Sequence, residues 1–360
     1  MRAARCQAAS RRVGAVGREV SRSWLRGPTI VDVAFPDNLH MMNNNEVEKI
    51  NQHYVSHFYL KSWSVDGIKI GAFSEGKFFT PKAKRIAFSK RFYRVNGLTS
   101  DQARLLRREA ERTLPPFSGL FAALISSCEE LPVRERFAPL WGTSDEIERK
   151  RTNLIEDFYS FIEGIVLVPY ELLIGKKYEE VNMDHFKILI RFAFFQLTRT
   201  PKAREGVRAA TAELLAEHNI GFDDYNLISS LILAERIAAE TIRRVYELVV
   251  IENQTDSNFI TSDSPVVNLK NPADSEMKIY WPVSPRQAIL IKPSALQGAE
   301  RYDVVRRVDA GDRHMRYFMS IAKLADRDQV ERFNKKIWDH RHKVAFCLNE
   351  GDISELRSVE

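Results

Sequence analysis

The spacing of apolar residues divides the chain into a β-rich beginning, a helical middle and a β-rich end. From Gly67 to Arg94, apolar and polar residues alternate around glycine and proline turns, which predicts short strands. From Thr99 the apolar residues recur with helical spacing, and beyond Tyr246 the alternation of strands returns. The pattern predicts a β-rich section over residues 52–98, a helical section over 99–247 and a second β-rich section over 248–292. A C-terminal helix and strand are predicted within 320–348.

Capping residues place several helix starts within the helical section. Thr99 followed by Gln102 is a capping box, and Thr143 with Glu146 repeats it. Asn182 can cap the next helix, which is apolar nearly all round and is expected to run through the core. Together these patterns predict an α+β fold, with a helical middle packed on a mixed or antiparallel sheet built from the N- and C-terminal β segments.

The start of the chain differs in composition from the rest. Residues 1–40 contain seven Arg, no Lys and three acids, as a transit peptide would; a start codon assigned too early, or a disordered tail, would also account for this. Pro28 and Pro36 would interrupt an amphipathic helix, which favours these last two explanations. We expect no fixed fold for residues 1–45 and a single α+β domain over 46–350.

The amino-acid composition bears on nucleic-acid binding, membrane spans, cellular compartment and cofactors. Outside residues 1–40 the chain has 47 basic and 45 acidic side chains, so its charge gives no support for nucleic-acid binding. The longest apolar stretches, such as Ile188–Leu197, are too short and too polar to cross a membrane. Three scattered cysteines without a CxxC pair fit a reducing cytoplasm better than a disulfide framework. The chain carries no nucleotide-binding fingerprint, so we predict no cofactor, and its partners stay unknown.

Two segments place hydrogen-bonding side chains in apolar surroundings: QHYVSHFYL at Gln52–Leu60 and FITSDSPVV at Phe259–Val267. The histidines His53 and His57 are four apart, as a metal pair on a helix would be. In the metalloprotease pattern HExxH, a glutamate between the two histidines is the catalytic base. The residues between His53 and His57, Val55 among them, include no carboxylate, so this base is missing and we predict no metal site.

Four segments in this order, QHYVSHFYLKSW, QLTRTPKARE, FITSDSPVV and WPVSP, resemble a large, mostly bacterial family of uncharacterised proteins, DUF4238, known by its HYVP and TSDxP motifs. The resemblance spans roughly Gln52 to Phe346. It implies a fold and a candidate site but no reaction. Ser56 stands where the family usually has Pro, and Ser264 where it usually has Asn.

The polar residues of these motifs each have a structural and a functional interpretation. His53 can be a core histidine held by hydrogen bonds, or a general acid or base near neutral pH. Asp263 can cap a turn, or orient His53 or a water molecule. Arg199 can end a helix and pair with a carboxylate, for which Asp263 is one candidate, or bind a phosphate or carboxylate together with Arg204.

The sequence leaves open whether the protein is an enzyme. One hypothesis is a hydrolase acting on a phosphodiester or nucleotide-like substrate; the other is a non-catalytic binding or interaction module, in defence or regulation, whose motifs are structural. We expect the His53 ring within hydrogen-bond or one-water reach of Thr261, Ser262 or Asp263, because an unpaired buried polar group costs about 1–3 kcal/mol. The candidate catalytic residues are His53 and Asp263, and the candidate substrate-binding residues are Gln52, Tyr54, Gln196, Arg199, Arg204, Thr261 and Ser262.

Overall fold

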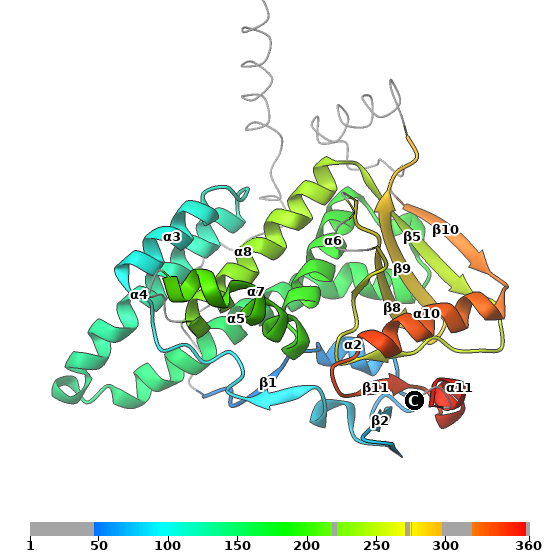
Figure 1. Ribbon diagram of the computed structural model, residues 1–360, viewed down its shortest axis with the longest axis horizontal. Helices are drawn as coiled ribbons and strands as arrows, with labels where there is room; N and C mark the ends of the chain where they lie inside the picture. Colours follow the sequence, from blue (N-terminus) through cyan, green and yellow to red (C-terminus); the bar gives the residue numbers. More distant parts are fainter. Residues whose placement is uncertain (1–46, 218–221, 271–273, 275, 297–318, 358–360) are drawn as a thin grey trace, which may run out of the picture.

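The computed structural model describes residues 47–217, 222–270, 274, 276–296 and 319–357 (Figure 1). The tail predicted over residues 1–45 lies outside the described residues. The helices are α2 (His57–Lys61), α3 (Ser100–Ala110), α4 (Phe117–Trp141), α5 (Ser144–Ile174), α6 (Met183–Thr198), α7 (Pro201–Glu217), α8 (Phe222–Arg243), α10 (Arg327–His340) and α11 (Ser354–Arg357). The strands are β1 (Asn51–His53), β2 (Gly71–Ser74), β3 (Lys77–Phe79), β4 (Phe88–Lys90), β5 (Tyr246–Asn253), β6 (Thr261–Ser262), β7 (Val267–Asn268), β8 (Ile279–Ser284), β9 (Gln287–Pro293), β10 (Met319–Leu324) and β11 (Ala345–Cys347).

Two of the predicted helix caps form and one does not. The Thr99 hydroxyl accepts the Gln102 amide at 3.3 Å, and the Gln102 side chain accepts the Thr99 amide at 2.9 Å, which confirms the capping box of α3. The Asn182 side chain caps α6. The box predicted at Thr143 is wrong, because this side chain makes no capping hydrogen bond at the start of α5.

The strands form three sheets, and the fold is α+β as predicted. One sheet pairs β1 with β4, and a second has the order β10-β5-β9-β8-β7, in which β10 is parallel to β5 and the other pairs are antiparallel. The third sheet, β3-β2-β11-β6, is antiparallel and joins N-terminal to C-terminal strands. The expected joining of the two ends of the chain therefore occurs in this third sheet, while the largest sheet comes from the C-terminal part alone.

Strand β8 contacts two different layers through neighbouring residues. The ring centroid of Trp281 lies 6.2 Å from that of Tyr59 in α2 and 5.5 Å from that of Phe192 in α6. The Tyr280 ring stacks on Phe333 of α10 at 4.4 Å. Because successive side chains of a strand point to opposite faces, the helical part covers one face of the sheet and α10 the other (Figure 1).

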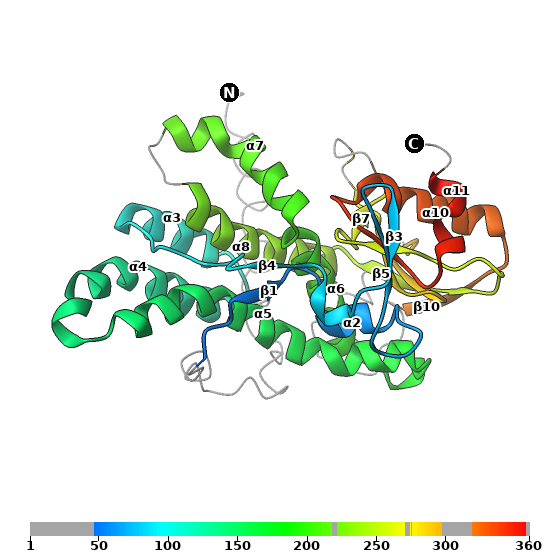
Figure 2. The ribbon, with the colours of Figure 1, turned by 90° about the horizontal axis from the view of Figure 1, so that it is seen from below.

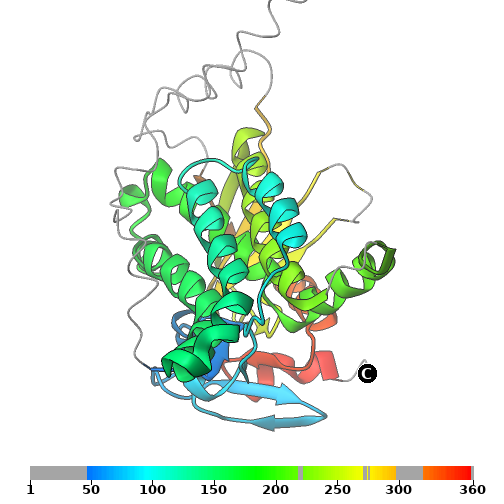
Figure 3. The same ribbon diagram turned by 90° about the vertical axis from the view of Figure 1, so that its left-hand side faces the viewer.

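Helix α6 lies at the centre of the helical part, as its apolar sequence predicts. It packs against α5 and α8, and its residues from Ile188 to Gln196 are buried. Figure 2 shows α2 and α6 between the helices on one side and the β-rich part on the other. Figure 3 shows the blue N-terminal strands beside the red C-terminal segment. In the described part of the chain, no helix combines the length and apolar character that a membrane span needs.

Candidate functional site

The first motif is anchored by Gln52, which is fully buried. Its Nε2 donates to the carbonyl of Thr152 at 2.6 Å, and its Oε1 accepts the amide of Tyr93 at 2.5 Å. A buried side-chain amide that donates and accepts in this way links three segments of the chain. Gln52 therefore fixes the entry of the chain into the helical part.

Two side chains at the end of α6 hold the backbone of the same motif. Gln196 donates to the carbonyl of Tyr54 at 2.8 Å. Arg199 donates through Nη2 to the carbonyl of His53 and through Nε to the hydroxyl of Tyr93 at 3.1 Å. The second motif, QLTRTPKARE, thus binds the main chain of the first one, through residues 142 and 146 positions away in sequence.

The remaining contacts of Arg199 are also within the protein. Its Nη1 donates to the Ser56 hydroxyl at 3.2 Å and to the Glu163 carboxylate at 2.7 Å. The guanidinium lies 4.2 Å from the ring centroid of Tyr159. Arg199 is only 2 % exposed. Because all three guanidinium nitrogens donate hydrogen bonds and an aromatic ring covers the guanidinium plane, few donor positions of Arg199 remain for a ligand.

The third motif, FITSDSPVV, is held by Asp263, which is 1 % exposed. Its carboxylate accepts the backbone amides of His342 at 2.8 Å, Lys343 at 2.8 Å and Val344 at 3.0 Å. These amides belong to the turn between α10 and β11. Burial raises the pKa of Asp263, and the three amide hydrogen bonds oppose this shift. The Ser262 hydroxyl accepts the amide of Ser264 at 3.1 Å, so the local turn is made by this serine.

The first and third motifs meet through Tyr59 and Thr261. The Tyr59 hydroxyl donates to the carbonyl of Pro282 at 2.6 Å, so its bond with the Thr261 hydroxyl at 2.5 Å has Thr261 as the donor. Tyr59 lies in the segment QHYVSHFYL, and Pro282 in WPVSP. This buried chain of hydrogen bonds joins three of the four motifs.

The contact that we expected between the motifs is not the one that forms. Within the described ranges, the His53 ring makes no hydrogen bond to Thr261, Ser262 or Asp263. The expected pairing of Arg199 with Asp263 is wrong: the carboxylate that Arg199 binds is that of Glu163. The physical reason is that three backbone amides already occupy the Asp263 carboxylate.

One group of titratable side chains lies beside this network. The Nδ1 atom of His53 is buried and has no hydrogen-bond partner among the described residues. Burial lowers the pKa of His53, as do the nearby His57 and Arg199, whereas Glu163 raises it. The His57 side chain is exposed, and the Glu163 side chain is 26 % exposed. His53 is therefore neutral near pH 7 and has a free acceptor next to a partly accessible carboxylate.

Sequence reasoning missed two acids of α5 that belong to this group. Burial raises the pKa of Glu156 to about 7, Arg199 lowers it and Glu163 raises it. The Oε2 atom of Glu156 is buried without a partner in the part of the chain that is described. Glu156, Tyr159 and Glu163 follow at intervals of three and four on one helix face, and this spacing was the available signal.

The comparison with protein families is decisive for classification. The model of the family described as "Protein of unknown function (DUF4238)" matches residues 51–346. The chain belongs to the DUF4238 family. No curated protein and no solved structure matches it.

The two departures from the DUF4238 motifs have different consequences. Ser56, in place of the usual Pro, donates to the Glu163 carboxylate at 2.8 Å and accepts from Arg199, so the serine adds to the network. Ser264, in place of the usual Asn, has a buried hydroxyl oxygen without a hydrogen-bond partner among the described residues.

Two further candidate residues lie at the edge of the network in this DUF4238 protein. Burial and the charge of Asp263 raise the pKa of Tyr54 to about 12, so its phenol stays protonated. The Tyr54 ring packs against Phe92 with centroids 5.4 Å apart. Arg204 of α7 donates to the carbonyl of Phe92, and its guanidinium lies 4.4 Å from the Phe92 ring centroid. Arg204 is thus separated from Arg199 by the segment Phe92–Tyr93, and it lines a different surface.

Proposed function

We propose that this DUF4238 protein is a non-catalytic binding protein whose four motifs form the scaffold of the fold. One observation carries this proposal: Gln52, Gln196, Arg199 and Asp263 are all buried, and each bonds to the backbone of a distant segment. Catalytic groups need access to a substrate, and these four have almost none. Buried polar side chains with satisfied partners are typical of structural roles.

The scaffold interpretation also accounts for the order of the motifs. The first motif is held by the second, through Gln196 and Arg199. It also binds the third and fourth, through Tyr59 with Thr261 and Pro282. Removing one partner from such a network leaves the other buried and unsatisfied, at a cost of about 1–3 kcal/mol for each group. All four segments would then be needed for folding, whatever the protein binds.

The replacement Asp263→Asn tests the scaffold. The new amide group presents N–H toward backbone amides that need an acceptor, so we expect a loss of about 2–4 kcal/mol, seen as a fall in melting temperature of about 5–10 °C. Asp339→Asn is the matched control, because this α10 side chain is 51 % exposed and pairs with the side chain of Lys335. A melting temperature of Asp263→Asn equal to that of the control would contradict the scaffold role.

A hydrolase acting on a phosphodiester or nucleotide-like substrate is the second candidate function. It is favoured by the unpartnered Nδ1 of His53 beside Glu163. In this version His53 accepts a proton from the attacking water and returns it to the leaving alkoxide, while Glu163 stabilises the protonated ring. Asp263 takes no part, because its carboxylate is committed to the turn before β11.

The hydrolase version is tested with bis(p-nitrophenyl) phosphate as substrate. It predicts turnover that His53→Gln abolishes and His57→Gln retains, since His57 is an exposed residue whose ring centroid lies 6.2 Å from that of His53. The melting temperatures of both variants are measured in parallel, so that a folding defect is recognised. Absence of turnover by the unaltered protein on this substrate would count against the hydrolase and leave the binding function.

A further inference from the structure

The segment from His57 to Arg94 carries a local excess of positive charge. It contains nine basic and two acidic side chains. The rest of the chain from residue 41 onward has 38 basic and 43 acidic ones, so the nearly neutral total conceals this excess. The total charge therefore says nothing about this one segment, and only the distribution of the charges shows where a polyanion could bind.

Most of these charges have no counter-charge within the described ranges. Arg91 and Arg94 pair with acids of other segments. The other seven basic residues are exposed, and none of them forms an ion pair or a side-chain hydrogen bond with another described residue. Of the two acids, Asp66 accepts the backbone amides of Ile68 and Lys69, and it lies in solvent, where its attraction for the Lys69 ammonium is screened. The seven charges are therefore available to a bound anion.

Two of these cations converge on His57 from different elements. Helix α2, which ends at Lys61, packs against the 3₁₀ turn η3 (Ala83–Arg85). Burial lowers the pKa of His57, the charges of Lys61 and Lys84 lower it further, and Glu163 raises it. A like charge has this effect only from nearby. The cations of α2 and η3 therefore lie on one side of the molecule, where Figure 2 shows α2 beside the blue hairpin that contains β3.

Two further lysines face each other across neighbouring extended segments. Lys69 lies directly opposite Lys82 in an antiparallel β-bridge, and both residues are exposed. Like charges in directly opposite positions destabilise a sheet. An anion bound between the two ammonium groups removes this repulsion, so the bridge is better suited to a liganded surface than to a bare one.

Aromatic rings lie among the charges on two strands. Strand β3 places Lys77 and Phe79 two residues apart, and β4 does the same with Phe88 and Lys90. Because residues two apart point to the same side of a strand, each strand presents a ring together with an ammonium group. Phe79 is 41 % exposed, whereas Phe88 is half-buried, with its ring centroid 5.6 Å from that of His53. Both rings are thus held at the surface beside a cation.

We propose that this basic face, formed by the seven exposed cations of residues 57–94 with Phe79 and Phe88, binds a single strand of nucleic acid. Each phosphodiester carries a negative charge, and unpaired bases have flat faces that stack on aromatic side chains. Proteins that bind single strands without sequence preference combine these two features. Lysines contact phosphates, which DNA and RNA share, so strands of either kind are expected to bind.

A duplex and an anionic lipid surface match the basic face less well. A duplex offers phosphates, but its base faces are stacked on one another and do not reach a side-chain ring. A lipid surface is recognised by clustered lysines together with apolar side chains that insert between the lipids. The half-buried ring of Phe88 does not project far enough to insert, whereas its position suits stacking on a base.

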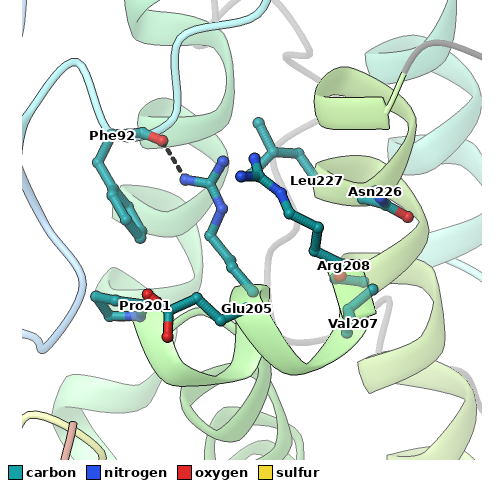
Figure 4. A pocket seen from close by; sticks show the side chains of 9 residues that line it. Phe92, Pro201, Glu205, Val207, Arg208, Asn226 and Leu227 are labelled. Atoms are coloured by element: carbon teal, nitrogen blue, oxygen red, sulfur yellow. Dashed lines mark hydrogen bonds between the residues drawn. The ribbon is translucent and has the colours of Figure 1, made fainter. Parts of the chain in front are cut away.

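The scaffold holds part of this face in place. In the β1–β4 pair Gln52 lies opposite Ser89, and Gln52 is itself fixed by its buried hydrogen bonds. The end of the segment is held at Phe92, which lines a cavity of 160 Å³ between α7 and α8 and accepts a hydrogen bond from Arg204 there (Figure 4). A surface that is fixed before its ligand arrives loses less entropy on binding. The inference rests on the proposed binding function and adds the class of partner.

Fluorescence anisotropy with the full chain tests the proposal, with labelled oligo(dT) and oligo(U) of about 20 nucleotides as probes. We expect both strands to bind, with an affinity that falls steeply as salt is added. Each phosphate contact contributes about −0.7 to the slope of log K against log salt. Lys82→Gln with Lys84→Gln should therefore weaken binding about tenfold or more and make the slope less steep by about 1.4.

Phe79→Ala tests the stacking part separately. It should weaken binding about five- to a hundredfold and leave the salt slope unchanged, because it removes a ring and no charge. Phe79→Tyr, which retains a ring, should bind like the unaltered protein. The melting temperatures of all variants are measured in parallel, so that a folding defect is recognised.

Arg104→Gln with Arg112→Gln is the matched control for the lysine variant. It removes two charges in and just after α3, from side chains that are 64 % and 63 % exposed and lie outside residues 57–94. Its affinity for both strands should stay within about twofold of the unaltered protein, since distant charges are screened by salt.

The proposal is overturned if either strand fails to bind, if a duplex of the same length binds more tightly, or if the control weakens binding as much as the lysine variant. Binding to vesicles of phosphatidylcholine and phosphatidylserine in equal parts, without binding to the strands, would overturn it in favour of a lipid surface. None of these results affects the Asp263→Asn melting experiment, so failure of the partner assignment is distinguishable from failure of the scaffold.

Discussion

Arg199 donates from all three guanidinium nitrogens, and the acceptors among the described residues are groups of the protein itself: the His53 carbonyl, the Tyr93 hydroxyl, the Ser56 hydroxyl and the Glu163 carboxylate. From the sequence alone, an arginine in a motif is equally suited to binding a ligand or closing a core. The burial of its neighbours decides between these, and burial depends on segments far away. Glu163 lies 36 residues before Arg199 and has no motif of its own.

The raised pKa of Glu156 leads to a prediction about how stability depends on pH. Its pKa is about 7 in the fold because of burial, against 4.5 in an exposed chain. Unfolding therefore releases a proton between these two values, and the free energy of unfolding falls as the pH rises through this window. Above pH 7 the loss amounts to about 3 kcal/mol. Glu156→Gln, which cannot ionise, should be more stable than the unaltered protein at pH 8 and equally stable at pH 4.5 or below.

Urea unfolding at pH 8 and pH 4.5 measures this difference. Glu171→Gln is a suitable control, because Glu171 is an exposed residue of the same helix. The assignment of a raised pKa to Glu156 fails if Glu156→Gln destabilises the protein at pH 8, or if its effect is the same at both pH values.

The starts of two helices could be predicted from residues close to them in the sequence. The Thr99 and Asn182 caps depend on residues three positions away, and both form. Sheet membership was not predictable. FITSDSPVV forms the short strands β6 and β7 around a turn, but β6 pairs with β11 whereas β7 pairs with β8 in another sheet. The exchange of sheets occurs at Asp263, where the turn before β11 supplies the amides, and no periodicity encodes that partner.

Helices α6 and α8 are linked by a buried ion pair that allows a test of their packing. Arg191 and Glu235 meet at 3.0 Å, with side chains 7 % and 0 % exposed. Glu235→Gln leaves the arginine without a counter-charge, so we expect a loss of about 3–5 kcal/mol. Replacing both residues, by Arg191→Met with Glu235→Leu, should recover most of it, because an apolar pair of similar volume packs without a desolvation penalty.

Denaturant unfolding of the single and double variants measures this coupling. Arg236→Gln serves as the comparison, since Arg236 is the next residue of α8 but is 38 % exposed. A double variant less stable than Glu235→Gln would mean that the ion pair, and not the apolar packing around it, holds α6 against α8.

At the scale of the whole molecule, the ends of the chain are tied into one structure. β11 pairs with β2 on one side and with β6 on the other, so the C-terminal strand closes a sheet begun near the N-terminus. The helical part and the largest sheet share Trp281, which contacts α2 and α6. The sequence indicated this closure only through the β-rich sections on both sides of the helical one. The pairing of β2 with β11 joins residues more than 200 positions apart. Local sequence patterns do not identify partners at such a distance.

This arrangement predicts that residues 46–350 unfold in a single transition. A separate C-terminal domain would have to give up the β2–β11 pairing and expose Trp281, at a cost comparable to unfolding it. Urea titrations followed by tryptophan fluorescence and by far-UV circular dichroism should therefore coincide, with one midpoint. Limited proteolysis under native conditions should not release two stable fragments by cleavage near Tyr246, where the helical part passes into β5. Two midpoints, or a fragment from Tyr246 onward that keeps a cooperative melting transition, would show that the largest sheet folds alone and that the motifs connect two domains.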